Sequence, residues 1–539
     1  MHPHARQAQG SALTASPTIV DAAGLPMRRL SASGAALAAG DTMSQELARW
    51  NPALRSADAT YLPLRDRVAA RVHDIAANNG WASGAMQRYV DQAIGADFRF
   101  SWRPDVSALG LDRDWLKINK RVVESRFRAW GADPRRYADA AEHDTLSGMM
   151  GLAFRQCFLD GESLGLAQWI ERPDFGFATA IQMIDPDRLS NPDGRMDDAE
   201  LRGGIERNAF GAATHYYIRE SHPGDVTGFF GGAVWKRIPR RMAHGRAVVL
   251  HHFEKQRAGQ SRGVPILTPI LERFKMADRM SRTEMQSALV NAIFAATITS
   301  PFDQTMGDGV FGETVTGYQQ GRLEFAKANP IELDGVRIPR LFPAEELKFH
   351  ASAGPGAQYA AFEERTLRYF AAAIGQPYEE VAQDWSSTNY SSARAAMLSA
   401  WKFLTARRGA FADGFATQIF ALWLEEAMDR GYLDLPPGAP GFWDNPAAWC
   451  RGKWTGAPRG WVDPTKEAQA SQMRMDAGLS TLRDECAEQG QDWEEVLEQR
   501  RAELDQIEEY GLPRPGWADG PVGASPDRGA DEGSTAHAV

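Results

Sequence analysis

The sequence has few cysteines and no long apolar run. Its three cysteines, Cys157, Cys450 and Cys486, form no CxxC pair, so they predict neither a disulfide framework nor a cysteine-rich zinc site, and they fit a reducing compartment. The longest apolar stretch, residues 288–299, is interrupted by Asn291 and is shorter than the roughly 18 residues that a membrane-spanning helix needs. We therefore expect a chain with no membrane partner.

An excess of positive charge is also missing. The chain has 60 Lys and Arg residues against 70 Asp and Glu residues, which gives a formal net charge of −10. A surface with this average charge repels phosphate and lacks the cations that tight nucleic-acid binding requires. If the chain meets DNA, we expect it to let the DNA slide without holding it.

What the sequence does contain is enough apolar material for several packed units. It has 539 residues, of which 43% are hydrophobic, and this length predicts two to four units. Residues 1–45 and 511–539 are rich in small residues, Gly and Pro without sustained periodicity, so we predict that both ends are disordered.

Helical periodicity dominates between these ends, which predicts an α+β, mainly helical fold. Residues 61–94 predict two helices that separate near Asn79, and residues 115–130 predict a helix with a basic face. Residues 163–253 show short apolar runs between turn residues, which predict strands at 166–170, 177–184, 215–218, 226–230 and 247–253. Helices are expected again over residues 392–430 and 464–510.

Two long helical stretches bracket a small β-rich segment. Pro265 opens the first, which extends to about residue 296, and the second covers residues 357–374. Between them, residues 297–354 contain Gly, Pro and alternating runs such as 337–341 and 347–350, which are typical of short strands.

Two pentapeptides, residues 161–165 and 259–263, match the G-x-S-x-G pattern of a hydrolase nucleophile. Such a serine must stand between a strand and a helix and must be followed along the chain by an acid and a histidine. Ser163 precedes a predicted strand and Ser261 precedes Val264-Pro265, so glycine-containing turns are the favoured interpretation. A serine hydrolase that uses Ser163 or Ser261 remains the enzyme alternative.

Three other patterns lack the context that their chemistry needs. Residues 307–312 match G-x-G-x-x-G, but a poor helix start follows, so a loop is favoured over a dinucleotide site. Residues 189–200 resemble a calcium loop whose first ligand is replaced by Leu189. His251 and His252 are neighbours in a predicted strand and point to opposite faces, so we expect one buried and one surface histidine. We predict no metal and no cofactor.

An ordered set of short stretches resembles the lambda-type portal proteins of tailed bacteriophages, from about Arg65 to Glu509. The sequence departs from the family pattern at residues 209–214, where the family more often has a polar turn. The stretches that carry the resemblance are Arg65-Asp66-Arg67, Asn78-Asn79-Gly80, Ile94-Gly95, Ile184-Asp185-Pro186-Asp187-Arg188-Leu189, Gly204-Ile205-Glu206, Tyr216-Tyr217-Ile218, His222-Pro223-Gly224, Val249-Leu250-His251, Gln260-Ser261-Arg262-Gly263-Val264-Pro265, Ile374-Gly375-Gln376-Pro377-Tyr378, Asn389-Tyr390-Ser391-Ser392-Ala393-Arg394 and Trp461-Val462-Asp463-Pro464-Thr465-Lys466-Glu467-Ala468.

The resemblance implies a structural protein without catalytic residues. It implies a ring, usually of twelve subunits, at one vertex of the virion capsid, assembled in the host cytoplasm. Double-stranded DNA would pass through the channel without sequence specificity during packaging and ejection. The implied partners are the terminase large subunit, the major capsid protein and the head-completion or adaptor proteins. A capsid scaffold protein without a channel remains the other alternative.

The resemblance also implies a portal fold in which regions surround a central channel. These regions are a disordered arm (1–45), a wing (46–264), a first stem helix (265–296), a clip (297–354), a second stem helix (355–375), a tunnel loop with wing helices (376–460), a crown (461–510) and a disordered tail (511–539). The tunnel loop would contain Asp384, Trp385, Ser386, Ser387, Thr388 and Asn389. We hypothesise that four basic residues of the first stem helix meet neighbouring helices or phosphates: Arg273, Lys275, Arg279 and Arg282. The alternative for these charges is a solvated or salt-bridged helix face.

Overall fold

The computed structural model describes most of the chain between Arg49 and Ala518. The described residues are 47, 49–225, 233–293, 296–299, 317, 320–321, 323–325, 327–328, 346–349, 357–386, 388–460 and 463–518. All elements below belong to the unit that spans Ala57–Val539. Several predictions lie outside the described residues: the arm 1–45, the run 226–230, the pattern 307–312, the run 337–341, Ser387, the tail beyond 518 and most of the segment 297–354.

Two helices form where residues 61–94 predicted them. After the short α1 (Ala57–Tyr61), helix α2 covers Arg65–Asn78 and helix α3 covers Gly80–Ala93. They separate at Asn79, whose extended backbone and side-chain oxygen cap α3 by accepting the backbone N–H groups of Trp81 and Ala82. The predicted break is confirmed.

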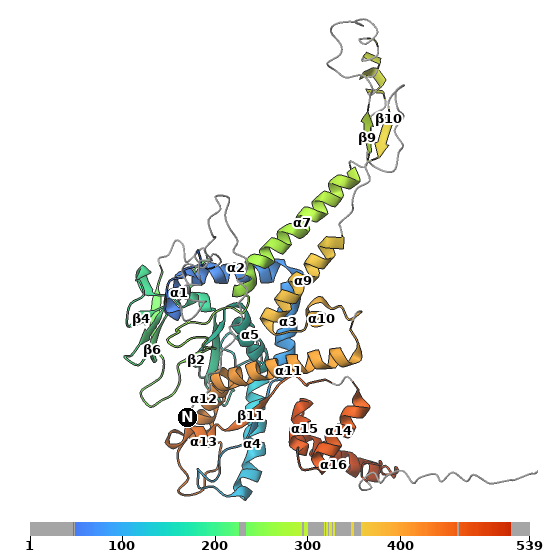
Figure 1. Ribbon diagram of the computed structural model, residues 1–539. Helices are drawn as coiled ribbons and strands as arrows, with labels where there is room; N and C mark the ends of the chain where they lie inside the picture. Colours follow the sequence, from blue (N-terminus) through green and yellow to red (C-terminus); the bar gives the residue numbers. More distant parts are fainter. Residues whose placement is uncertain are drawn as a thin grey trace, which may run out of the picture. The chain divides into compact units, whose positions relative to one another are not determined.

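The main core packs helices around aromatic side chains. Besides α2 and α3, its helices include α4 (Arg113–Gly131), α5 (Leu146–Leu159), α11 (Tyr390–Phe411), α12 (Thr417–Asp429) and the short α13 (Pro446–Trp449) (Figure 1). Antiparallel strands β1 (Arg99–Trp102) and β11 (Gly452–Thr455) bring distant parts of the chain together. The side chains of Trp102, Trp130, Trp423 and Trp449 are fully buried, so aromatic packing is a large part of this core.

Two antiparallel sheets fill the region predicted to be β. The first has the order β3–β2–β8 and the second the order β4–β5–β6–β7. Their strands are β2 (Glu162–Trp169), β3 (Thr179–Ile184), β4 (Leu201–Arg202), β5 (Ile205–Arg207), β6 (Ala213–Arg219), β7 (Trp235–Pro239) and β8 (Val249–Phe253). A smaller core that includes Leu164, Ile205 and Tyr216 joins them. The sequence analysis did not predict β4, β5 or β7.

A π-helix, Ala412–Ala416, links α11 to α12 within one continuous helical run. The prediction of helices over residues 392–430 is confirmed, but the periodicity gave no sign of this irregularity. The π-helix packs against β8, and an ideal Cβ at Gly414 would stand 2.0 Å from Nδ1 of His252. Only a glycine therefore fits here without displacing that histidine.

The first long helix, α7, covers Leu271–Ile293, and the second, α9, covers Ala357–Ile374. The predicted start at Pro265 is wrong, because Pro269 lies in a 3-10 turn, Thr268–Ile270, that precedes α7. The predicted second helix is confirmed. Beyond α7, strand β9 (Ala296–Thr299) pairs antiparallel with β10 (Glu346–Phe349), which overlaps the predicted run 347–350 (Figure 1).

Helix α10 (Tyr378–Ala382) follows α9, and three helices form the C-terminal part of the described chain: α14 (Pro464–Asp476), α15 (Leu482–Glu488) and α16 (Trp493–Glu509). They confirm the helices predicted over residues 464–510. Each begins at a residue whose side chain caps the helix: Asp463, Thr481 and Asp492.

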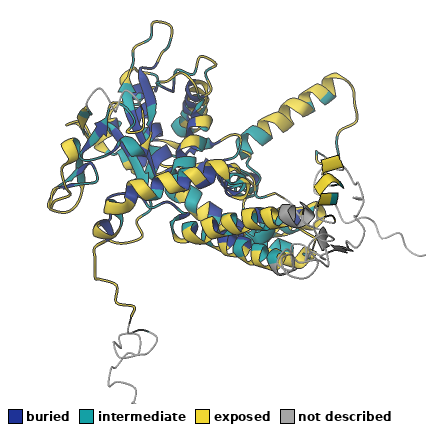
Figure 2. Ribbon diagram, turned by 90° about the horizontal axis from the view of Figure 1, so that it is seen from above, coloured by how far each residue is buried: buried dark blue, intermediate teal, exposed yellow. Residues whose placement is uncertain are grey.

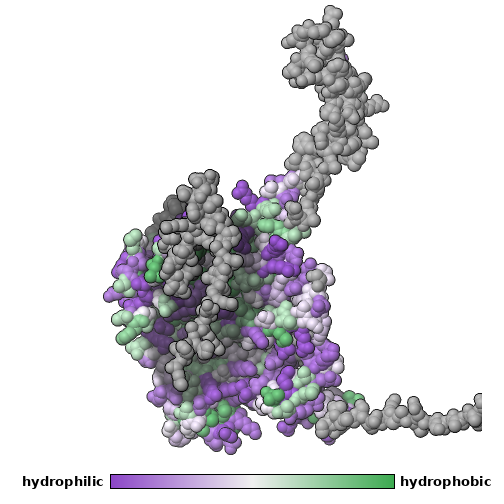
Figure 3. All heavy atoms as spheres, viewed as in Figure 1, coloured by the Kyte–Doolittle hydropathy of each residue, from purple (hydrophilic) through white to green (hydrophobic). Residues whose placement is uncertain are grey.

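Buried residues gather in the sheets and in the helices packed on them, whereas helices that leave this core are mostly exposed (Figure 2). In the view of Figure 3, hydrophilic residues cover much of the described surface and apolar residues form small scattered patches. None of the described helices combines the length and the apolar character that crossing a membrane requires.

Candidate functional site

A buried ionic network fixes the segment that leads into α7. Glu162, the first residue of β2, is fully buried, and Arg262 donates to its Oε1 from Nη2 at 2.5 Å and from Nε at 2.8 Å. Its other oxygen accepts the backbone N–H of Gly263 at 2.9 Å and the Nε2 proton of His251 at 2.9 Å. Arg65 of α2 lies 3.5 Å away. The Glu162 carboxylate thus contacts residues of α2, of β8 and of the loop that precedes α7.

Charge pairing, not burial, sets the ionisation state of Glu162. Burial alone would raise its pKa, but Arg262, His251 and Arg65 together hold that pKa well below the ordinary value. Arg262 also donates to the backbone carbonyls of Leu189 and Gly203, at 2.6 and 2.8 Å. The guanidinium is therefore saturated with acceptors, as a buried arginine must be.

The two G-x-S-x-G serines lie in this region but do not form a hydrolase site. Ser163 stands inside β2 opposite His252, and its fully buried Oγ has no hydrogen-bond partner among the described residues. Ser261 is buried in a loop and donates its hydroxyl proton to Asp58 at 2.8 Å. Neither serine is exposed at the start of a helix, so the nucleophile elbow is absent at both positions.

The other sequence patterns take part in ordinary structure. Pro192–Gly194 forms a 3-10 turn, and Asn191 and Asp197 hydrogen-bond to one another and to the loop backbone, which confirms the predicted turn. The side chain of His251 is buried, in agreement with the expectation of one buried histidine. His252 is partly buried and lines a cavity, and this burial lowers its pKa to about 4.

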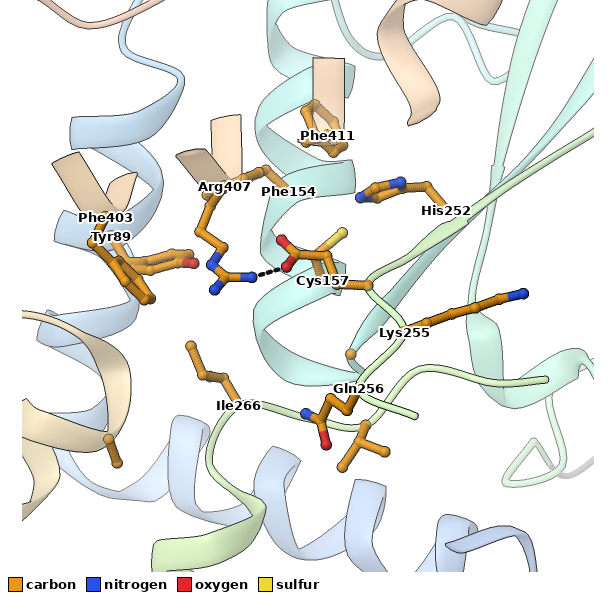
Figure 4. A pocket seen from close by; sticks show the side chains of 14 residues that line it. Tyr89, Phe154, Cys157, His252, Lys255, Gln256, Ile266, Phe403, Arg407 and Phe411 are labelled. Carbon is orange, nitrogen blue, oxygen red and sulfur yellow. Dashed lines mark ion pairs between the residues drawn. The ribbon is translucent and has the colours of Figure 1, made fainter. Parts of the chain in front are cut away.

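That cavity has a volume of about 420 Å³ and lies where α3, α5, β8, α9 and α11 approach one another (Figure 4). Aromatic side chains form much of its wall, including Tyr89, Phe154, Phe403 and Phe411. Arg407 projects into it and pairs with Glu254 (Figure 4). The cavity separates the π-helix region from the segment that leads into α7.

Replacing Gly414 by alanine tests how closely His252 packs on the π-helix. We expect Gly414→Ala to destabilise the chain by about 1–3 kcal/mol, because the new Cβ collides with the imidazole ring. Removing the ring in a His252→Ala/Gly414→Ala double variant should recover part of this loss. Gly409→Ala in α11, where a Cβ meets nothing within 4 Å, is the matched control and should be neutral or slightly stabilising in thermal unfolding.

A group of three metal-ligand side chains, Asp185, Asp187 and His222, lies on the surface near Arg65. His222 accepts the backbone N–H of Gly224 on Nδ1 at 3.0 Å, so the neutral ring carries its proton on Nε2. That Nε2 faces the two carboxylates, 3.9 and 3.6 Å away. Since a metal needs the unprotonated nitrogen, a polar contact between the Nε2 proton and the two carboxylates explains this group better than metal binding.

Helices α7 and α9 pack side by side near their attachment to the core. The rings of Phe274 and Phe370, both buried, lie 5.0 Å apart, and the Arg273 guanidinium stacks on Tyr369 at 4.2 Å. Lys275 is 3.5 Å from Asp74 of α2, and Arg282 pairs within α7 with Asp278 at 3.1 Å. All four basic residues singled out on α7, including Arg279, are exposed, and they do not converge on one another in the single chain.

The loop between α10 and α11 contains the predicted residues 384–389, of which Ser387 is not described. Gln383 ends α10 in the left-handed conformation, with φ of 54°. Asp384 accepts hydrogen bonds from the hydroxyl and backbone N–H of Ser386, which lower its pKa. Asn389 caps α11 by accepting the Ser392 N–H at 2.9 Å. Gln383 and Asn389 therefore mark the two ends of the loop, and Trp385 and Thr388 lie between them.

A family model described as "Phage portal protein, lambda family" matches residues 43–408 of the chain. Portal protein B of Escherichia phage lambda is 34% identical over 489 residues, which cover 89% of this chain and 91% of the relative. The portal protein of Escherichia phage N15 has the same identity and coverage. The chain belongs to the lambda family of phage portal proteins. It is a structural component of a tailed-phage virion, and no comparison supports the hydrolase alternative.

Solved structures that match part of the chain include the neck of an empty gene transfer agent particle, with 12% identity, a TM-score of 0.43 and coverage of 88% of this portal protein and 100% of that chain. An HK97-family portal protein from Corynebacterium diphtheriae has 14% identity and a TM-score of 0.23, over 53% of this chain and 84% of that chain.

For this portal protein, sequence reasoning located the paired long helices and the loop but missed the ionic network. The only signal was indirect: Arg65, His251 and Arg262 fall in short stretches that carry the family resemblance. Glu162 belongs to the G-x-S-x-G pattern at residues 161–165, which was weighed as a hydrolase motif. His251 belongs to the pair of neighbouring histidines. Since Glu162 and Arg262 are 100 residues apart, nothing in their local spacing pairs them.

Proposed function

We propose that the chain assembles into a ring, with twelve as the usual number of subunits, that forms a channel for double-stranded DNA at one capsid vertex. The observation that carries the proposal is the family match over residues 43–408, which includes both α7 and α9. DNA enters through the ring during packaging and leaves through it during ejection. The ring acts without catalytic residues of its own and assembles in the host cytoplasm.

Regions of the chain have separate tasks in this proposal. Helices α7 and α9 form the stem, residues 297–354 form the clip that docks the terminase large subunit, and α14, α15 and α16 form the crown. Residues 384–389 form the tunnel loop. The wing meets the major capsid protein, and head-completion or adaptor proteins bind after packaging. Support for the stem comes from the packing of α7 on α9 near the core.

Apolar side chains on α7 support assembly with further copies. Met276, Met280 and Met285 are 62%, 38% and 64% exposed in the single chain. Their burial against a neighbouring stem removes apolar surface from water, which favours association. The net charge of −10 on each chain supports a channel that does not retain DNA, because a surface with this average charge repels phosphate.

Reversing the charge of Arg273, Lys275, Arg279 and Arg282 to glutamate is expected to reduce ring assembly or DNA packaging by about tenfold or more, since these exposed cations meet neighbouring helices or phosphates. Ring yield by size-exclusion chromatography and packaged DNA per particle are the measurements. The control reverses four exposed cations on the β-rich part, Arg195, Lys236, Arg237 and Arg241. Unchanged assembly and packaging in the stem variant would disprove this role.

Negative-stain microscopy of the purified chain tests the channel. Rings with a central hole are expected, whereas a scaffold without a channel gives particles without one. The latter result would refute the proposed function.

A further inference from the structure

Helix α16 covers a basic face of α4 with a row of carboxylates. Lys120 lies 2.7 Å from Glu494, and Arg121 lies 2.7 Å from Glu498. Glu495 pairs with Arg128 of α4 and, at 2.8 Å, with Arg99 of β1. The three glutamates lie within the first two turns of α16, so one acidic face meets one basic face.

The whole helices have opposite charges, beyond the residues in contact. Helix α4 contains six Lys and Arg residues against two acidic residues. Helix α16 contains seven acidic residues against two arginines. The opposite charges of the two helices favour the position of α16 on α4. Without α16, α4 is a strongly cationic helix in a chain whose net charge is −10.

Two of the three ion pairs between the helices are weak. No residue of α16, which is described throughout, is buried. The side chains of Arg121 and Arg128 are 67% and 53% exposed, and ion pairs at such positions contribute little and are screened by salt. The pair of Lys120 with Glu494 is the stronger one, because the Lys120 side chain is only 10% exposed. A charged groove of about 830 Å³ runs between the helices, so the basic face is only partly covered. A competing polyanion can therefore displace α16.

We propose that the basic face of α4 is a binding surface for the phosphate backbone of duplex DNA, and that α16 occupies this surface as an internal acidic mimic. Lysine and arginine form the same charge-assisted hydrogen bonds with carboxylates and with phosphates. From Lys117 to Arg128 the helix rises by about 16 Å, enough to face several phosphates. The choice of DNA over an acidic protein rests on the proposed function, which brings duplex DNA past this chain.

The test compares two full-length variants with the same change in charge. Glu494→Gln/Glu495→Gln/Glu498→Gln removes the carboxylates that touch α4. Asp505→Asn/Glu508→Gln/Glu509→Gln removes three exposed carboxylates of the same helix that have no ion-pair partner among the described residues. Binding to a fluorescent duplex of about 20 base pairs is measured by anisotropy at several salt concentrations. The contact variant should bind about tenfold more tightly than the wild type at low salt, and its affinity should fall steeply with salt.

Three results would overturn the inference. Equal gains in both variants would show a general charge effect, and no gain in the contact variant would show that α4 does not bind DNA. Displacement of α16 by polyglutamate but not by DNA would assign the surface to an acidic protein. Adding Lys120→Gln/Arg121→Gln/Arg128→Gln to the contact variant should abolish its gain.

A measurement on the wild type covers the case in which the variants fold poorly. Duplex DNA at low salt should accelerate protease cleavage within residues 463–518, and cleavage at an unchanged rate would contradict the inference. Native mass measurement of each variant separates this question from the proposed function. If the contact variant forms normal rings but binds DNA no more tightly, only the inference that α16 mimics DNA on α4 is refuted. If the wild type forms no ring, the proposed function itself is refuted.

Discussion

Glu162→Ala is expected to destabilise the chain by about 3–5 kcal/mol, because it leaves Arg262 buried without its carboxylate. Both side chains are almost completely inaccessible, with exposures of 0% for Glu162 and 1% for Arg262, so solvent cannot replace the lost partner. The segment that Arg262 and Gly263 belong to leads directly into α7. Thermal unfolding should therefore begin at a clearly lower temperature, and α7 should become more sensitive to proteases.

The pH dependence gives this prediction a second readout. The pKa of Glu162 lies well below its ordinary value of 4.5, since Arg262, His251 and Arg65 outweigh the effect of burial. A depressed carboxyl pKa adds stability above pH 4.5, and that stability is lost as the pH falls below this value. The stability difference between wild type and Glu162→Ala should accordingly be full at pH 7 and shrink below pH 4.5.

Two further variants identify the cause. Glu171→Ala removes a carboxylate that is 64% exposed and paired with Arg430, and it should change stability by no more than about 0.5 kcal/mol. A Glu162→Leu/Arg262→Met double variant leaves no unpaired charge and should be more stable than Glu162→Ala. If Glu162→Ala unfolded like the Glu171→Ala control, the network would not be what holds this region together.

Glu124→Gln is expected to stabilise the chain above neutral pH. Burial raises the pKa of Glu124 to about 7, although Lys120 and the Trp102 N–H oppose the shift. The folded state therefore binds more protons than the unfolded state between pH 4.5 and 7, so stability falls as the pH rises through this range. At ~1.4 kcal/mol per pKa unit, the loss is about 3 kcal/mol.

Glutamine has no proton to lose, and its oxygen can still accept the Trp102 N–H. The melting temperature of Glu124→Gln should change little between pH 5 and pH 8 relative to the wild type, which should lose stability over this range. The matched variant Glu220→Gln changes an exposed carboxyl and should follow the wild type. A parallel pH dependence in Glu124→Gln and the wild type would assign the effect to other groups.

Long helices were the most predictable part of the fold, because a buried stripe repeats over many turns and polar residues end it. Asn79 shows this well, since the residue that interrupts the apolar pattern is also the cap of α3. The start of α7 was misplaced because Pro265 is a good helix opener, whereas Pro269 keeps residues 268–270 in a 3-10 turn. The short strands β4 and β5 have two or three residues, too few to show an alternation.

The candidate site was predictable only where it is local. The loop at residues 384–389 has Asn389 as a helix cap, a signal that its sequence contains. The Glu162 network has no such signal, because its members come from α2, β2, β8 and a loop, and only the folded chain brings them together. The same holds for α4 and α16: the basic face was visible in the sequence, but the carboxylates that cover it lie more than 360 residues away, as with Glu495 and Arg128.

We propose that copies of this chain close into a ring around a DNA channel. Native mass spectrometry of the purified full chain tests it most directly. We expect a dominant species of about twelve times the 59.4 kDa chain mass, with neighbouring ring numbers as minor species. A single species of one or two chains, at concentrations where the protein is folded, would contradict the account.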